Sequence, residues 1–145
     1  MENLALSTKE TDKDFELTLT ISPRRMSRDA FLAGRFNETL YFTNNSKAAL
    51  EFITNGSNCF QFVDIVVVDQ NGKNHAPEKF GDGHIITLEA NKKYVVHPGE
   101  RVGGTFSLWL VVRGQISPGT YRVQAFLTYE DLKVSSNIVQ LVIYP

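Results

Sequence analysis

One cysteine and three histidines are the side chains of this chain best suited to catalysis. A nucleophilic cysteine needs a base beside it, and no histidine lies near Cys59 in the sequence. Only a Cys–His pair that folding brings together would supply that base. The simpler interpretation is a small thiol packed next to Phe60. The sequence therefore predicts a protein without enzymatic activity.

Three polar residues around one loop, His75, Asp82 and His84, could in principle bind a divalent metal ion. Their spacing matches no recognised ligand motif, and calcium sites usually gather several carboxylates in one short loop. Asp69 is therefore expected to shape the turn at Asn71-Gly72 rather than to bind calcium with Asp82. We expect neither a metal ion nor a cofactor.

The only basic cluster contains Arg24, Arg25, Arg28 and Arg35. Such a cluster can bind a phosphate or an acidic protein surface, but solvated loop charges are the simpler interpretation. The formal net charge of the whole chain is -1. This balance argues against nucleic acid as a partner.

The sequence predicts that short β-strands position these residues. Apolar and polar residues alternate along much of the chain, and turn signals such as Asn71-Gly72 separate the runs. The predicted strands are 15–21, 36–43, 50–53, 60–69, 85–88, 94–96, 104–112, 119–129 and 137–143. Seven to nine short strands without an amphipathic helical window predict an all-β, antiparallel, immunoglobulin-like β-sandwich.

A length of 145 residues suits one domain with one hydrophobic core. Residues 1–13 are polar and are predicted to be a flexible tail, so the domain is expected to span residues 14–145. Tyr121 follows Pro118-Gly119-Thr120 at the start of a late strand. This position suits the tyrosine corner of immunoglobulin-like domains.

Cysteine usage and hydropathy bear on the compartment. A single cysteine allows no intramolecular disulfide, so the core must be stabilised by hydrophobic burial. Residues 1–13 lack the apolar segment of a signal peptide, and no run approaches the roughly 20 apolar residues that a membrane span needs. We expect no membrane insertion, and a location in the cytoplasm or export with the signal segment already removed.

A series of turns and apolar strands from Asn44 onward carries a family resemblance. The series contains Asn44-Asn45-Ser46-Lys47, Leu50 with Phe52, the run from Val63 to Lys73, a strand ending at Leu88, Pro98-Gly99-Glu100, Phe106 with Trp109, and the segment from Pro118 to Val123. In this layout the chain resembles the BsuPI-type intracellular proteinase inhibitors, a bacterial family with an immunoglobulin-like sandwich. The resemblance implies a non-enzymatic protein whose partner is a protease.

Loop 73–84 is the segment through which such a protein would insert into or cover a protease cleft. It is long and polar, and rigid strands are predicted on both sides of it. Its candidate protein-binding residues are His75, Pro77, Glu78, Lys79 and Phe80. Inhibitors of this family tend to carry a Trp-rich segment at this place, and this chain does not.

An outward apolar face is the second candidate protein-binding surface. If their strands are neighbours, one broad face is lined by Phe60, Phe62, Val66, Val68, Trp109, Val111 and Phe126. A monomer seldom leaves such a face in contact with water, and Trp and Phe are typical interface anchors. A bulge that inverts the faces, or coverage by loops 22–35 and 73–84, would remove this surface.

Two further functions remain open at this point. The chain could be a structural or adhesive subunit that forms a homo-oligomer through the apolar face or through an unpaired edge strand. It could also be a carbohydrate-binding accessory module in which Trp109, Tyr41 or Tyr129 stacks on sugar rings.

Overall fold

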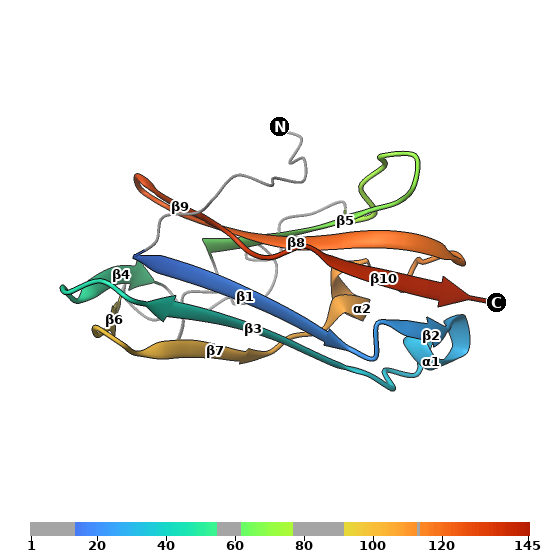
Figure 1. Ribbon diagram of the computed structural model, residues 1–145, viewed down its shortest axis with the longest axis horizontal. Coiled ribbons are helices and arrows are strands. Elements are labelled where there is room, and N and C mark those ends of the chain that lie inside the picture. Colours follow the sequence, from blue (N-terminus) through green and yellow to red (C-terminus); the bar gives the residue numbers. More distant parts are fainter. Residues whose placement is uncertain (1–13, 55–61, 77–91, 113) are drawn as a thin grey trace.

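The computed structural model describes residues 14–54, 62–76, 92–112 and 114–145, which form ten β-strands and two short helices (Figure 1). The strands are β1 (Phe15–Ser22), β2 (Arg25–Ser27), β3 (Asn37–Asn44), β4 (Leu50–Thr54), β5 (Val63–Val68), β6 (Lys92–Val96), β7 (Arg101–Thr105), β8 (Gly119–Tyr129), β9 (Leu132–Ser135) and β10 (Val139–Tyr144). The helices are α1 (Arg28–Leu32) and α2 (Leu108–Val111). The predicted all-β fold with antiparallel sheets is confirmed, with ten strands in place of seven to nine. The predicted strand 85–88 lies outside the described residues.

The first sheet contains three strands in the order β1-β3-β7. β1 and β3 pair in antiparallel fashion over eight residues each, from Phe15 opposite Asn44 to Ser22 opposite Asn37. Because successive side chains point to opposite faces of a strand, one face of this sheet is apolar. That face contributes Leu17, Leu19, Ile21, Leu40 and Phe42 to the core, as the alternation predicts.

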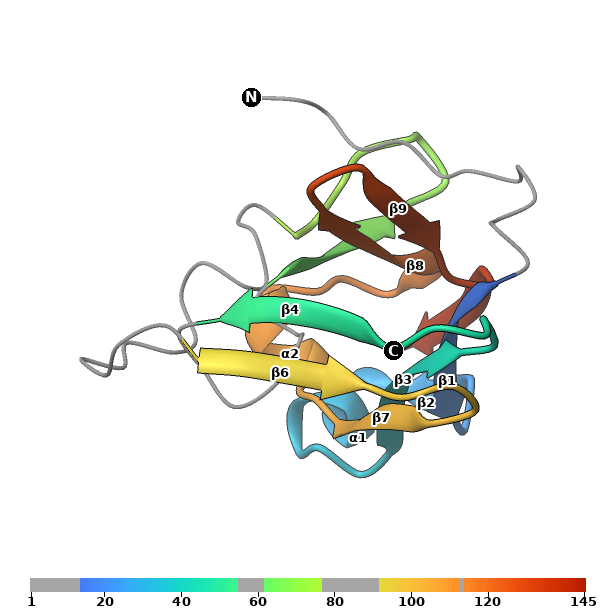
Figure 2. The same ribbon diagram turned by 90° about the vertical axis from the view of Figure 1, so that its left-hand side faces the viewer.

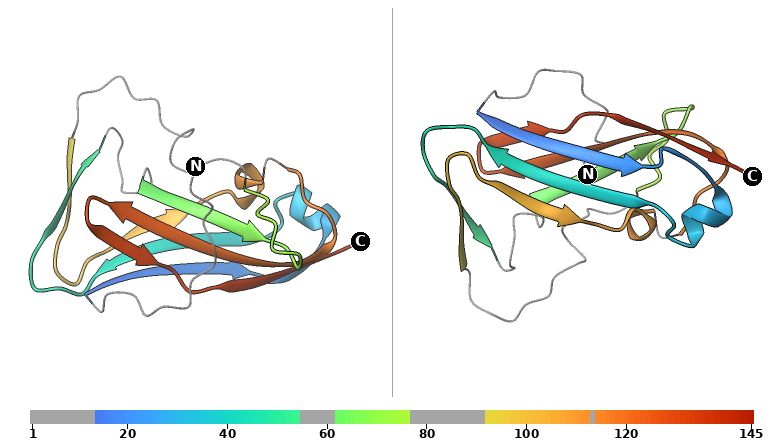
Figure 3. Two further views of the ribbon diagram at one scale, coloured as in Figure 1. Left: turned by 90° about the horizontal axis from the view of Figure 1, so that it is seen from above. Right: turned by 60° about the horizontal axis from the view of Figure 1, so that its bottom comes forward.

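The second sheet has the order β2-β10-β8-β5, and β9 also pairs with β8. β2 joins β10 in parallel, and the other pairs are antiparallel. Its inner face presents the apolar positions predicted for β5, β8 and β10. They are Val63, Ile65, Val67, Tyr121, Val123, Ala125, Leu127, Val139, Leu141 and Ile143. The two sheets form two layers with this core between them (Figures 1 and 3).

Asn137, in the connection from β9 to β10, closes one margin of the two layers. Its Oδ1 accepts the N–H of Leu19 at 2.8 Å, and its Nδ2 donates to the carbonyl of Leu19 at 2.9 Å. A neighbouring strand would make the same two bonds to Leu19. Ser136 also forms an isolated parallel bridge with Leu17. The edge of β1 is therefore joined to the second sheet.

β4 and β6 form a two-stranded antiparallel sheet, the β4–β6 sheet, at one end of the molecule (Figure 2). The fully buried Asn44 joins this sheet to β3: its Nδ2 donates to the carbonyls of Ala48 and Val96, both at 2.9 Å. Its Oδ1 accepts from the backbone N–H and the hydroxyl of Ser46. The turn predicted at Asn44-Asn45-Ser46 thus depends on the side chain of Asn44.

Aromatic packing connects the β4–β6 sheet to the second sheet. Phe52 of β4 is fully buried, and its ring meets the ring of Phe42 edge to face, with 5.9 Å between the centroids. On the other side it contacts Phe62 and Tyr129, with centroids 5.7 and 4.9 Å away. The hydroxyl of Tyr129 also accepts the N–H of Ile53 at 3.0 Å.

The prediction of a single strand at residues 104–112 is wrong. β7 ends at Thr105, and α2 begins at Leu108. The carboxylate of buried Glu38 accepts the N–H of Leu108 at 3.0 Å, and its carbonyl accepts the N–H of Phe106 at 3.3 Å. The carboxylate thereby satisfies a donor for which a helix start has no carbonyl partner. An alternating pattern alone could not reveal this contact with β3.

The sequence pattern did not predict three short elements. β2 and α1 lie in the segment 22–35, which was interpreted as a loop, and β9 lies between two predicted strands. Ser27 begins α1, since its Oγ accepts the N–H of Ala30 at 3.0 Å. Elements of three to five residues are too short to establish a period.

Candidate protein-binding site

The root of the predicted binding loop is a turn that follows β5 and is held by Asp69. Its Oδ1 accepts the N–H of Asn71 at 2.8 Å and that of Lys73 at 3.0 Å. Its own N–H donates to the carbonyl of Lys73 at 2.9 Å. Gly72 in this turn has a φ of 83°, which glycine adopts without the strain of a Cβ. Asp69 therefore shapes the turn, as predicted.

Asn74 and His75 fold the next residues back along the free edge of β5. The N–H of His75 donates to the carbonyl of Val67 at 2.7 Å. The Oδ1 of Asn74 accepts the N–H of Val67 at 3.1 Å and that of Ala76 at 3.0 Å. The loop therefore begins as a fixed continuation of the second sheet.

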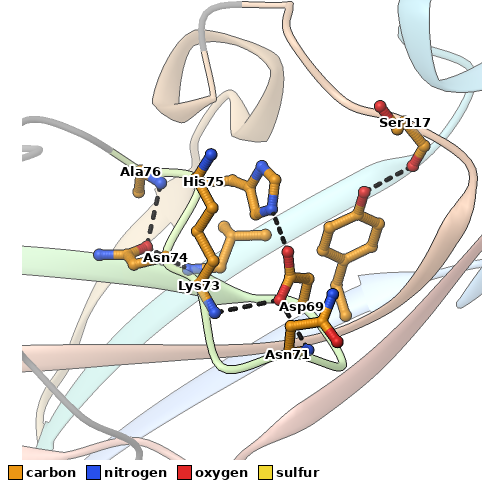
Figure 4. A network of polar contacts seen from close by, with 9 residues as sticks. Asp69, Asn71, Lys73, Asn74, His75, Ala76 and Ser117 are labelled. Carbon is orange, nitrogen blue, oxygen red and sulfur yellow. Dashed lines mark hydrogen bonds and ion pairs between the residues drawn. The ribbon is translucent and has the colours of Figure 1, made fainter.

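The side chain of His75 completes this network (Figure 4). Its Nε2 lies 2.7 Å from Oδ2 of Asp69, and both side chains are 21% exposed. The ring packs edge to face against Tyr121, with 5.4 Å between the centroids. The hydroxyl of Tyr121 donates to the carbonyl of Ser117 at 2.5 Å, which is the contact expected of a tyrosine corner.

Electrostatics in this network follow from the same contacts. The hydrogen bond with His75, followed by that from the Lys73 backbone, lowers the pKa of Asp69 below its ordinary value. Burial raises the pKa of the Tyr121 phenol. Within the described ranges, no group of three His, Cys, Asp or Glu side chains could hold a metal ion. In this part of the chain, Asp69 and His75 hold a turn in place.

Only the first of the five predicted loop residues can be located. His75 is fixed by Asp69, Val67 and Tyr121, as described above. The other four, Pro77, Glu78, Lys79 and Phe80, lie outside the described residues, as do Cys59, Asp82 and His84.

The predicted apolar face is not assembled as expected. Trp109 and Val111 belong to α2 and not to a strand beside β5 and β8, so the condition for one continuous face fails for them. Trp109 is 39% exposed and Val111 is buried. The correction follows from Glu38, which starts a helix where the alternation predicts a strand.

The remaining positions of that face are mostly withdrawn from water. Val66 and Val68 point away from the core of the sandwich and are nevertheless 0% and 7% exposed. Val66 is paired with the fully buried Gln124, and Val68 with Arg122. Phe62 and Phe126 are half-buried. Phe60 lies outside the described residues.

The three aromatic residues considered for sugar stacking lie in different environments. The ring of Tyr129 is packed against Phe52 and Phe62. Trp109 projects from α2, and a Cβ at Gly114 would stand 2.9 Å from its ring. Tyr41 lies on the outer face of β3, with the guanidinium carbon of Arg101 3.9 Å from its ring centroid.

Two of the four clustered arginines have partners within the fold. Nε of Arg28 donates to the carbonyl of Ile116 at 2.9 Å, and the guanidinium of Arg25 lies 5.7 Å from the ring centroid of Tyr144. All four arginines are nevertheless exposed to solvent.

Sequence reasoning missed the outer edge of β7 as a possible binding surface. Arg101, Gly103 and Thr105 are exposed there. The available signal was Gly103-Gly104, because glycine within a strand often marks a bulge or the close approach of another backbone.

Comparisons with known proteins assign no family to this chain. No family model matches this chain, and no curated protein proved to be a relative of it. Among the described residues, no helix is long and apolar enough to cross a membrane.

Proposed function

We propose that this chain is a non-enzymatic, protein-binding β-sandwich of the immunoglobulin-like type. Three features of the fold support the immunoglobulin-like assignment. The two sheets have the orders β1-β3-β7 and β10-β8-β5, β2 adds to β10, and Tyr121 makes a corner contact at the start of β8. The first, second and fifth strands of an immunoglobulin domain share one sheet, and the third, sixth and seventh share the other.

The observation that carries the binding function is the fixed root of loop 73–84. Asp69, Asn74 and His75 hold residues 73–76 against β5 through five hydrogen bonds from or to backbone groups and through the contact between Nε2 of His75 and Oδ2 of Asp69. A loop whose root is ordered in advance loses less conformational entropy when a partner binds. Recognition loops on rigid sandwiches commonly work in this way.

The specific form that we propose is a proteinase-inhibitor-like protein. The resemblance of the turn and strand layout to the BsuPI-type inhibitors supports it, and the loop that follows Ala76 is the segment that would enter or cover a protease cleft. The resemblance is the reason to test proteases before other partners.

Replacement of residues 77–80 by a Gly-Ser linker tests this proposal. We expect the variant to lose inhibition in a panel of serine proteases, because the contact residues are gone while the turn from Asp69 to Ala76 remains. A thermal unfolding curve like that of the wild type would show that the fold is intact. The matched control is Lys47→Ala in the turn between β3 and β4, which should inhibit like the wild type. Unchanged inhibition by the linker variant would refute the loop assignment.

A further inference from the structure

The outer edge of β7 differs from the edges of β1, β5 and β10, each of which has a backbone or side-chain partner. Asn137 occupies the edge of β1, Asn74 and His75 occupy the end of β5, and β2 covers β10. No strand pairs with the outer side of β7 within residues 14–54, 62–76, 92–112 and 114–145. β7 lies at the lower margin of the molecule in Figure 1.

The ladder between β3 and β7 shows which backbone groups face outward. The N–H of Asn44 bonds to the carbonyl of Glu100, and the N–H of Phe106 bonds to the carbonyl of Glu38. Hydrogen-bonded pairs alternate along an antiparallel ladder, so Val102 and Gly104 bond to β3. The N–H and carbonyl groups of Arg101, Gly103 and Thr105 consequently point away from the sheet. All three residues are exposed.

The side chains beside this edge form two rows across the sheet. In one row Thr18, Tyr41 and Gly103 are in register, so the β7 residue directly beside Tyr41 carries no side chain. A Cβ at Gly103 would collide with the carbonyl of Leu40, which excludes other residues there. In the second row Glu16, Thr43 and Arg101 are in register, and the guanidinium of Arg101 lies over the ring of Tyr41 and brings a positive charge to the edge.

We propose that β7 is a docking edge that binds an extended, acidic segment of a partner polypeptide as a fourth, antiparallel strand of the first sheet. The inference rests on the proposed protein-binding function and specifies the chemistry of the partner. Main-chain hydrogen bonds to Arg101, Gly103 and Thr105 supply affinity in this recognition mode, and side chains on alternate positions supply specificity.

The two rows determine which side chains the segment carries. The residue opposite Gly103 continues the row of Tyr41, and because Gly103 has no side chain, an aromatic side chain at that position can extend toward Tyr41. Two positions further toward the C-terminus of the segment, the residue opposite Arg101 meets its guanidinium, and a glutamate or aspartate pairs with it. The expected pattern is therefore an aromatic residue followed two positions later by an acidic one.

A titration of the full, ¹⁵N-labelled chain with the peptide acetyl-Thr-Val-Tyr-Val-Glu-Thr-amide tests the proposal by NMR. We expect saturable shifts and slowed hydrogen exchange at the amides of Arg101, Gly103 and Thr105. The amides of Val102 and Gly104, already bonded to β3, serve as internal controls and should keep their exchange rates. A peptide with lysine in place of glutamate should bind about fivefold more weakly, the scale of one exposed ion pair lost and reversed.

The charge-reversed variant Arg101→Glu provides the second arm. It should prefer the lysine peptide, and this rescue would also show that the variant is folded. Absence of shifts at the three edge amides at millimolar peptide, or equal affinity of both peptides for both proteins, would overturn the proposal. The Gly-Ser linker variant of residues 77–80 should still bind the peptide. If that variant lost inhibition and the β7 amides showed no shifts on addition of the peptide, this inference would be refuted. The proposed function would still be supported.

Discussion

Glu38 and Asp69 show how two carboxylates of one small domain come to respond to pH in opposite ways. Two effects act on the pKa of Glu38. Burial is the larger and raises this pKa, whereas the hydrogen bond from the N–H of Leu108 lowers it. Asp69 has a lowered pKa because His75 and the turn donate to it. Asp69 therefore contributes stability that is present above its ordinary pKa and is lost as the pH falls through the lowered value. Glu38 has the opposite sign, since its protonated form is favoured in the folded state.

Substitution Glu38→Gln isolates the contribution of this residue. A folded-state pKa above the ordinary value means that ionisation costs stability as the pH rises through that window. Gln keeps a carbonyl acceptor for the N–H of Leu108 and cannot ionise. We expect the free energy of unfolding of the variant, relative to the wild type, to increase from pH 4 to pH 7.

Urea unfolding at the two pH values measures this difference. Glu51→Gln is the control, because Glu51 is exposed on β4 and its variant should show no such trend. The role assigned to Glu38 would be contradicted if the free energies of unfolding of Glu38→Gln and the wild type differed by the same amount at pH 4 and at pH 7.

At the scale of elements, sequence pattern and structure agree where a strand is long and one face is buried. β1, β3, β8 and β10 were predicted with their inward residues, because alternation over six or more residues identifies the face that is buried. The pattern failed at α2, where one contact from Glu38 converts an apparent strand into a helix. It also could not reveal that His75 binds Asp69 or that Asn137 closes the edge of β1. Those contacts depend on hydrogen bonds of individual side chains, to another side chain for His75 and to the backbone for Asn137, which no periodicity encodes.

The edge of β1 yields a prediction about Asn137. Asn137→Ala removes both bonds to Leu19, and we expect a loss of roughly 1–3 kcal/mol of stability from the unsatisfied backbone groups. Asn137→Asp keeps an acceptor for the N–H of Leu19 and should lose less. The amide of Leu19 should exchange fastest in the alanine variant.

Hydrogen exchange followed by NMR provides that measurement. Gln140→Ala, at an exposed position of β10, is the matched control and should leave the exchange of Leu19 unchanged. If Leu19 remained as protected in Asn137→Ala as in the wild type, Asn137 would not be the group that closes this edge.

At the scale of the whole molecule, the β4–β6 sheet is joined to the two layers by a buried amide and by aromatic rings. Asn44 holds the backbone on one side, and Phe52 contacts Phe62 and Tyr129 on the other. The packed part of the molecule therefore extends beyond the core between the two sheets. The apolar face, which the alternation placed on one sheet, does not form in this arrangement, because Trp109 lies on a helix and Val66 is buried.

Asn44→Ala should uncouple the β4–β6 sheet from the sandwich. The carbonyl of Val96 would lose its donor in a buried site, at a cost of about 1–3 kcal/mol. We expect faster amide exchange throughout β4 and β6, with β8 and β10 less affected. Asn45→Ala, at the exposed neighbouring position, is the control. Equal acceleration in β8 and β10 would mean that the β4–β6 sheet and the sandwich unfold as a single unit.

The position of β10 between β2 and β8 also bears on the order in which contacts can form. Among the described strands, β10 is synthesised after both of its partners, β2 and β8. Leu19 and Asn137, which close the margin nearby, are 118 residues apart. Contacts this distant in sequence slow folding, because a large loop must close before they form. During synthesis, the edges of β2 and β8 that pair with β10 therefore stay unpaired until β10 has been made, and unpaired strand edges promote aggregation.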